Sequence, residues 1–264
     1  MKKIVLTLLL LMVSLSVQAA DFKHDIWDAL LKKHVIPIDQ GVATQVDYSG
    51  FLRDRALLKG YLGSLEEVSQ STFESWQKSE QLAFLINAYN AWTVEFILTE
   101  YPGLKSIKEL GSWIQSPWKK SFIPLLGETR SLDDIEHGLI RAKNRYQEPR
   151  IHFAVNCASI GCPALAPRAY LGEHISTQLD EATRLFLSDR SRNRLTGDTL
   201  YVSKIFDWYR EDFERGWGGF TSLEQFFVTY SNPLGLTDGD IRRLQSKDID
   251  IEFLEYDWRL NNKS

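Results

Sequence analysis

EQLAFLINAYNAWTVEFILTEYP, residues 80–102, is almost unbroken and apolar, and it lies within the longest helical candidate of the chain, residues 73–101. Pro102 and Gly103 stop the pattern, as expected at the end of a helix. A helix that is apolar on nearly every side is buried. We therefore predict a long, buried helix in this segment.

Shorter patterns flank this segment on both sides. Apolar residues at helical spacing predict further helices near 26–34, 51–65 and 175–186. Ser131 and Asp134 resemble a capping box that opens another helix over residues 132–144. Short strands are predicted at 122–126 with a return at 129–130, at 151–155, on both sides of Gly197-Asp198, and at 248–258.

These elements predict an α+β fold. The chain has no repeat, low-complexity tract or linker, so residues 20–264 are expected to form one mainly helical domain with a small sheet of short strands. A fold similar to that of cysteine hydrolases is one architecture that fits this prediction.

The N-terminus MKKIVLTLLLLMVSLSVQA, residues 1–19, has the pattern of a secretory signal peptide: two lysines, an apolar core and a small-residue cleavage site. It predicts a periplasmic or secreted protein that does not insert into the membrane once the signal is removed. An uncleaved anchor and a lipoprotein are the alternatives.

Composition and charge exclude two classes of protein. The net charge of −4 becomes −6 without residues 1–19, which hold two lysines and no acid, and no basic run remains to bind nucleic acid. The 14 Phe, 10 Tyr and 8 Trp residues are far too many large apolar side chains for a disordered chain. We expect a folded domain with a sizeable core.

Polar residues inside the apolar patterns are the first candidates for a site. Asn87 and Asn90 are three apart on one helix face, where they either pin the helix to a loop or point into a pocket. His137 is four residues from both Asp133 and Arg141, so Asp133 would fix its tautomer if this helix face is not simply solvated. Glu136 is turned away from His137 by about 100° on a regular helix.

HFAVNCASIGCPAL, residues 152–165, contains both cysteines of the chain. On a strand over 151–155, Asn156 shares the side of His152 and Cys157 points away, which makes a direct pair of Cys157 with His152 doubtful. Four alternatives remain for the cysteines. They are a Cys157–Cys162 disulfide, favoured by an oxidising compartment; a Cys157 thiolate with His137 or His152 as its base; a zinc site; and two inert thiols.

Five ordered segments resemble the family named "domain of unknown function 547": AFLINAYNAWTV, SLDDIEHGLIR, RIHFAVNCASIGCPAL, VSKIFDWYREDF and LEYDWRLN. The resemblance covers about residues 70–260 and implies one compact domain that is often exported in bacteria. The family has no settled activity. The resemblance implies that the polar and aromatic residues of the family signature are important for function. In this sequence they are Asn87, Asn90, Glu136, His137, Arg141, His152, Asn156, Cys157, Ser159, Cys162, Lys204, Trp208 and Asp212.

These residues favour a pocket and lead to three hypotheses. The first is a cysteine-dependent hydrolase or acyl transferase acting on an amide or ester. Cys157 would be the nucleophile, His137 or His152 the base and Glu136 or Asp133 its orienting acid, and Asn87 would help to bind the oxyanion. The residues expected to bind substrate are Asn87, Asn90, Arg141, Asn156, Ser159, Lys204, Trp208 and Asp212.

The second hypothesis is a binding or accessory module in which the Cys157–Cys162 disulfide stabilises a recognition loop, and Lys204 and Arg141 suggest an anionic ligand. The third is a thiol-redox protein, for which the spacing of the cysteines is unusual. We expect a small-molecule or peptide-like ligand, with a protein partner as the alternative. No metal or cofactor is expected.

Overall fold

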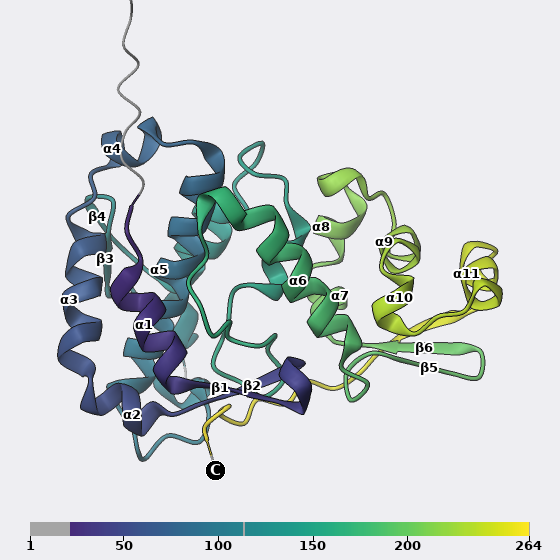
Figure 1. Ribbon diagram of the computed structural model, residues 1–264, viewed down its shortest axis with the longest axis horizontal. Helices are drawn as coiled ribbons and strands as arrows, with labels where there is room; N and C mark the ends of the chain where they lie inside the picture. Colours follow the sequence, from purple (N-terminus) through teal and green to yellow (C-terminus); the bar gives the residue numbers. More distant parts are fainter. Residues whose placement is uncertain (1–21, 113, 264) are drawn as a thin grey trace, which may run out of the picture.

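The long buried helix is α5, which runs from Lys78 to Leu98 and crosses the N-terminal half of the molecule (Figure 1). Nearly all of its side chains are buried, as its sequence predicts. The computed structural model of the protein describes residues 22–112 and 114–263, so the predicted signal peptide lies outside the described residues. Among the residues described, no helix combines the length and the apolar character needed to cross a bilayer.

Helices of the N-terminal half pack around α5 and form the larger of two apolar cores. They are α1 (Asp25–His34), α2 (Tyr48–Arg53), α3 (Arg55–Glu66) and α4 (Gln70–Ser75). The predicted helical segment 73–101 is broken between α4 and α5, where Trp76 and Gln77 have extended backbone.

The second core is built from phenylalanines. Phe153, Phe186, Phe206, Phe213 and Phe226 are almost fully buried against one another. The helices that carry or surround them are α6 (Ile175–Ser188), α7 (Ile205–Trp208), α8 (Arg210–Glu214), α9 (Leu223–Thr229), α10 (Ser231–Leu234) and α11 (Asp238–Gln245). Helix α6 runs between the two halves and contacts both α5 and α10 (Figure 1).

The strands form small, separate sheets. β1 (Val35–Ile38) pairs with β2 (Ala43–Val46), and β3 (Ile123–Leu125) pairs with β4 (Glu128–Arg130), both antiparallel. β5 (Arg194–Thr196) and β6 (Thr199–Val202) form the predicted hairpin, and β7 (Asp250–Phe253) joins β6 in parallel. The predicted α+β class, mainly helical with short strands, is confirmed.

The strand predicted at 151–155 is wrong. Residues Pro149–Phe153 form a short 3-10 helix, η5, with Pro149 in its first turn. The backbone on either side of Val155 bonds to a side chain of α5 instead of to a neighbouring strand. The Nδ2 of Asn90 donates to the Ala154 carbonyl, and the Asn156 N–H donates to the Asn90 Oδ1. The side-chain alternation argued for His152 and Cys157 therefore does not apply.

The helix predicted at 132–144 is a π-helix, η4, over Asp134–Ile140. The predicted capping contacts between Ser131 and Asp134 are present at 3.0 Å and 2.8 Å. A π-helix is rare, has a wider turn than an α-helix and frequently occurs at functional sites. Glu136 and His137 of this helix both line the same pocket.

Candidate functional site

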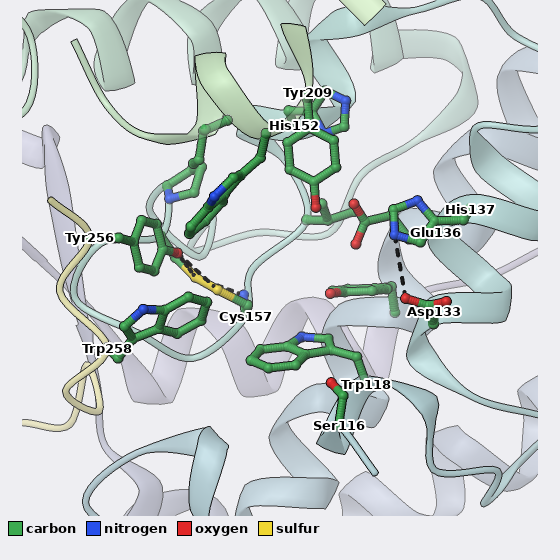
Figure 2. Close-up of a pocket in the computed structure, with 16 residues that line it drawn as sticks. Ser116, Trp118, Asp133, Glu136, His137, His152, Cys157, Tyr209, Tyr256 and Trp258 are labelled. Atoms are coloured by element: carbon green, nitrogen blue, oxygen red, sulfur yellow. Dashed lines mark hydrogen bonds and ion pairs between the residues drawn. A yellow bond between two sulfur atoms is a disulfide. The ribbon is translucent and has the colours of Figure 1, made fainter. Parts of the chain in front are cut away.

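A pocket of about 310 Å³ lies where the cysteine loop, η4, α5 and the C-terminal segment meet (Figure 2). Six of its sixteen lining residues are tyrosine or tryptophan, and its charged groups are acidic. The aromatic lining residues are Tyr89, Trp118, Trp208, Tyr209, Tyr256 and Trp258. Asp133, Glu136, His137, His152, Cys157 and Cys162 also line it. No lysine or arginine side chain is part of this lining within residues 22–112 and 114–263.

One side of the pocket is a cluster of indole and phenol rings. The ring centroids of Tyr256 and Trp258 are 4.5 Å apart, those of Trp208 and Tyr256 are 4.8 Å apart, and Trp118 lies 5.6 Å from Trp258. Trp208 keeps 45% of its surface exposed, which is unusual for so large an apolar side chain. The Nζ of Lys108 lies 3.8 Å from the ring centroid of Trp258 and makes a cation–π contact with this wall.

Glu136 provides the buried charge of the pocket. Its residue surface is only 5% exposed, and its Oε1 has no hydrogen-bond partner among the described residues. Figure 2 shows the hydroxyl of Tyr209 directed toward this carboxylate. Burial raises the pKa of Tyr89 and of Tyr209, and the neighbouring Glu136 charge raises both further. A buried carboxylate oxygen without a hydrogen-bond partner is costly.

Asp212 lies behind the pocket wall, where it orients His152. The Nε2 of His152 is 2.7 Å from the Asp212 Oδ2, and both side chains are almost completely buried. Arg141 and Arg215 each approach the same carboxylate to 2.5 Å. Burial favours the protonated acid, but the hydrogen bonds from His152 and Arg141 outweigh it and lower the pKa of Asp212 to about 2.

Burial of the His152 ring favours its neutral form. Burial lowers its pKa despite the opposing effect of Asp212. Because Asp212 accepts the Nε2 proton, Nδ1 carries the lone pair, and this atom is buried without a partner among the described residues. The ring stacks on Tyr209 with 3.8 Å between centroids.

His137 lies at the exposed end of the same network. Its Nδ1 contacts the Arg141 guanidinium, and its Nε2 is 3.4 Å from Asp133 (Figure 2). The predicted proximity of Asp133, His137 and Arg141 is thus present. The Arg141 guanidinium is hydrogen-bonded to Asp212 and contacts His137, and Arg141 does not line the pocket.

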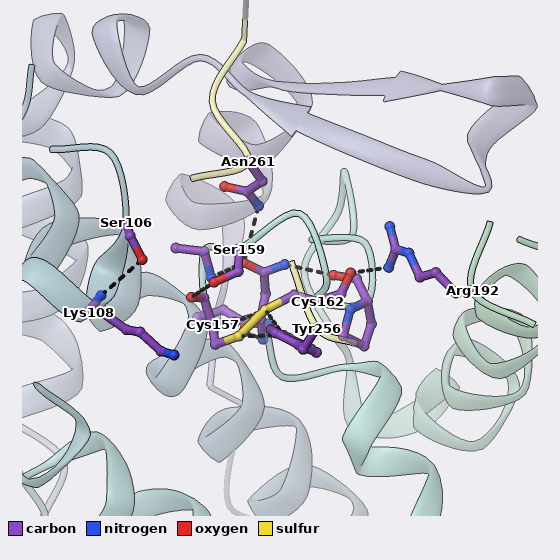
Figure 3. The surroundings of a disulfide bond; sticks show 12 residues. Ser106, Lys108, Cys157, Ser159, Cys162, Arg192, Tyr256 and Asn261 are labelled. Atoms are coloured by element: carbon purple, nitrogen blue, oxygen red, sulfur yellow. Dashed lines mark hydrogen bonds between the residues drawn. A yellow bond between two sulfur atoms is a disulfide. The ribbon is translucent and has the colours of Figure 1, made fainter. Parts of the chain in front are cut away.

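Cys157 and Cys162 form a disulfide in the pocket wall (Figure 3). The predicted disulfide alternative is confirmed. The hydroxyl of Tyr256 lies 3.0 Å from the Cys157 Sγ and 3.1 Å from the Cys162 Sγ, and the Cys157 N–H donates to the Cys162 Sγ at 2.9 Å. Neither sulfur has a hydrogen bond to His137 or His152 within the described chain. In this state Cys157 has no thiolate to act as a nucleophile, and the cysteines are not available to zinc.

The predicted asparagines act within the fold and do not line the pocket. The side chain of Asn87 forms two hydrogen bonds with the backbone of Tyr170. Its Nδ2 donates to the Tyr170 carbonyl at 2.7 Å, and its Oδ1 accepts from the Tyr170 N–H at 3.0 Å. Asn90 makes the two bonds to residues 154 and 156 described above. Asn156 donates to the Pro163 carbonyl and accepts from the Ala158 N–H, which shapes the cysteine loop. The prediction that Asn87 binds an oxyanion has no support in this arrangement.

Two other predicted residues also lie outside the pocket, and one lies inside it. Ser159 is 1% exposed in the cysteine loop, with its Oγ near the Cys157 carbonyl. Lys204 pairs with Asp207 at 2.7 Å, so the anionic ligand suggested by Lys204 and Arg141 is not supported. Trp208 lines the pocket, as expected of a substrate-binding residue.

Most of the aromatic wall is absent from the predicted site. Tyr89 is one of many buried residues of the apolar helix α5. Trp118 lies in a short 3-10 helix, Pro117–Lys119, whereas Tyr256 and Trp258 lie in the irregular segment that follows β7. The sequence signal that was available is the density of large aromatic residues in the stretches 113–118 and 254–261. Among the described residues, no group of three or more His, Cys, Asp or Glu side chains is arranged to hold a metal ion.

Comparison with known proteins gives a family but no activity. Residues 73–187 match the family described as "Protein of unknown function, DUF547". No curated protein and no solved structure matches the chain. The match contains α5, η4 and the cysteine loop, whereas VSKIFDWYREDF and LEYDWRLN lie beyond it. The family matched over residues 73–187 is the one that the sequence resembles.

Proposed function

We propose that this protein is a binding module whose aromatic pocket takes a small ligand with an ammonium group attached to an apolar body. The observation that carries the proposal is the Glu136 Oε1, a buried carboxylate oxygen that has no partner among the described residues and belongs to a pocket lined by six aromatic rings. An ammonium group would donate a hydrogen bond to Oε1, and the rings would contact the apolar body.

The chemistry of the lining favours a cation over an anion. Glu136 and Asp133 are both acidic, and the nearby Arg141 is already paired with Asp212. Electron-rich indole faces add a cation–π attraction of roughly 0.5–2 kcal/mol. An anionic ligand would meet two carboxylates and no basic side chain of the described lining.

A cysteine-dependent hydrolase receives less support from this geometry. It requires a free Cys157 thiolate next to a base, whereas the Cys157 Sγ is bonded to Cys162 and its hydrogen-bond neighbour is Tyr256. The disulfide instead joins the two ends of the loop that forms one wall of the pocket.

Calorimetric titration with three ligands of similar shape tests the proposal. They are 2-phenylethylammonium, the neutral 2-phenylethanol and the anionic 3-phenylpropionate. A hydrogen bond to a charged group is worth about 1.5–3 kcal/mol, so we expect the cation to bind about 10- to 100-fold more tightly than the alcohol, and the anion to bind most weakly.

Glu136→Gln should remove most of the preference for the cation, because the amide keeps the shape of the side chain without its charge. The matched control is Glu66→Gln, an exposed acid at the end of α3. Equal affinity for the three ligands, or an unchanged preference in the Glu136 variant, would contradict the proposal.

A further inference from the structure

The disulfide is unusual in being part of a pocket wall. Cys157 is partly exposed there, whereas Cys162 is only 3% exposed. A small molecule in the pocket therefore finds more accessible surface on Cys157 than on Cys162. The two sulfurs of this bond are chemically unequal, which a purely structural crosslink does not require.

The surroundings of Cys162 are suited to a departing thiolate. The backbone N–H of Cys157 donates to its Sγ at 2.9 Å, and the hydroxyl of Tyr256, which also lies 3.0 Å from the Cys157 Sγ, donates to it at 3.1 Å (Figure 3). Burial raises the pKa of Tyr256, so this hydroxyl keeps its proton and remains a donor. Hydrogen bonds to an ionised acceptor are about twice as strong as those to a neutral one, so both would strengthen as charge develops on Cys162.

We propose that the pocket supports thiol–disulfide exchange, in which a small thiol attacks the Sγ of Cys157 and the Sγ of Cys162 leaves. The attacking thiolate forms a bond to Cys157, the bond between the cysteines breaks, and its electron pair goes to Cys162 as a thiolate. The attacking sulfur is oxidised and Cys162 is reduced.

The mixed disulfide can then react in two ways. The Cys162 thiolate attacks Cys157 and restores the disulfide, releasing the small thiol unchanged. Alternatively, a second small thiolate attacks the sulfur of the first, which releases a small-molecule disulfide and leaves both cysteines reduced. Cys157 is the exchanging residue, Cys162 is the resolving residue, and Tyr256 is the donor to the leaving group.

The first test uses the wild-type protein and 2-mercaptoethanol, a thiol without charge on its carbon chain. This choice makes the result independent of the proposed cation binding. After acid quenching and alkylation of free thiols, tandem mass spectrometry of the tryptic peptide 151–168, which contains both cysteines, locates the adduct. We expect the mercaptoethanol adduct on Cys157 and the alkyl group on Cys162. Adducts on Cys162, or none until the protein is unfolded in urea, would overturn the proposal.

Two pairs of variants test the roles of the residues. With 2-hydroxyethyl disulfide, Cys162→Ser should form a mixed disulfide at Cys157 at least about tenfold faster than Cys157→Ser forms one at Cys162, because buried thiols are inert. Tyr256→Phe should slow the reduction of the disulfide by about tenfold, the effect of one hydrogen bond to a charged group. Tyr201→Phe, a partly exposed tyrosine on β6 outside the pocket, is the control. Equal rates within either pair would refute the assigned role.

Discussion

Replacing Asp212 with asparagine removes one buried charge and keeps the shape of the side chain. Asp212 is completely buried, and its carboxylate pairs with Arg141, Arg215 and His152. Breaking a buried ion pair costs about 3–5 kcal/mol, because the remaining charges stay uncompensated. The two arginine side chains are 18% and 32% exposed and gain some solvation, so we expect the lower end, about 3 kcal/mol.

The same substitution should change the response to acid. The pKa of Asp212 is lowered to about 2 in the folded protein, below the ordinary value of 3.8. A lowered pKa contributes stability that is present above the ordinary value and is lost as the pH falls through the folded value. This contribution amounts to about 2 kcal/mol, lost between about pH 5 and pH 2. The variant should lack this part of the acid destabilisation.

Urea unfolding followed by circular dichroism at pH 7, 5 and 3 measures both effects. Asp198→Asn is the matched control, because its carboxylate pairs with Arg243 while the side chain remains 81% exposed. Exposed pairs contribute about 0–1 kcal/mol, so the control should differ little from the wild type. An Asp212 variant that loses less than about 1 kcal/mol at pH 7, or that keeps the full acid response, would refute the reasoning.

Two further predictions concern the parts of the fold that shape the pocket. Asn90→Ala should lower the free energy of unfolding, measured by urea denaturation, by about 3 kcal/mol, because it leaves the Ala154 carbonyl and the Asn156 N–H buried and unpaired. The control is Asn232→Ala, at an exposed asparagine. Equal losses of stability in the two variants would contradict this prediction. Reducing the disulfide should cost about 2 kcal/mol, the loop-entropy value for so short a ring. A thermal melt with and without dithiothreitol checks it, and an unchanged midpoint would exclude this contribution.

Local patterns were sufficient to predict several of the helices and two of the hairpins, but not the β1–β2 hairpin. The apolar run of α5, the capping box at Ser131 and the turn at Gly197 each depend on residues that are close in sequence, and each is confirmed. The strand at 151–155 failed for a physical reason. Its backbone is satisfied by Asn90, a residue more than sixty positions away, which no local pattern contains.

The candidate site was predictable in its polar residues and not in its walls. Glu136, His137, His152 and Cys157 do line one pocket. Glu136 and His137 are adjacent residues of the π-helix η4, and both line the pocket. The indole and phenol rings come from segments that meet only in the folded chain. Which of these rings would lie together could therefore not be predicted from the sequence.

The central claim is that the Glu136 Oε1 receives the charged group of a ligand. A crystal structure of the protein with 2-phenylethylammonium tests it most directly. We predict the ammonium nitrogen within hydrogen-bond distance of that oxygen and the phenyl ring against the aromatic wall formed by Trp208, Tyr256 and Trp258. A ligand bound with its nitrogen turned to solvent, or bound only outside this pocket, would contradict the account.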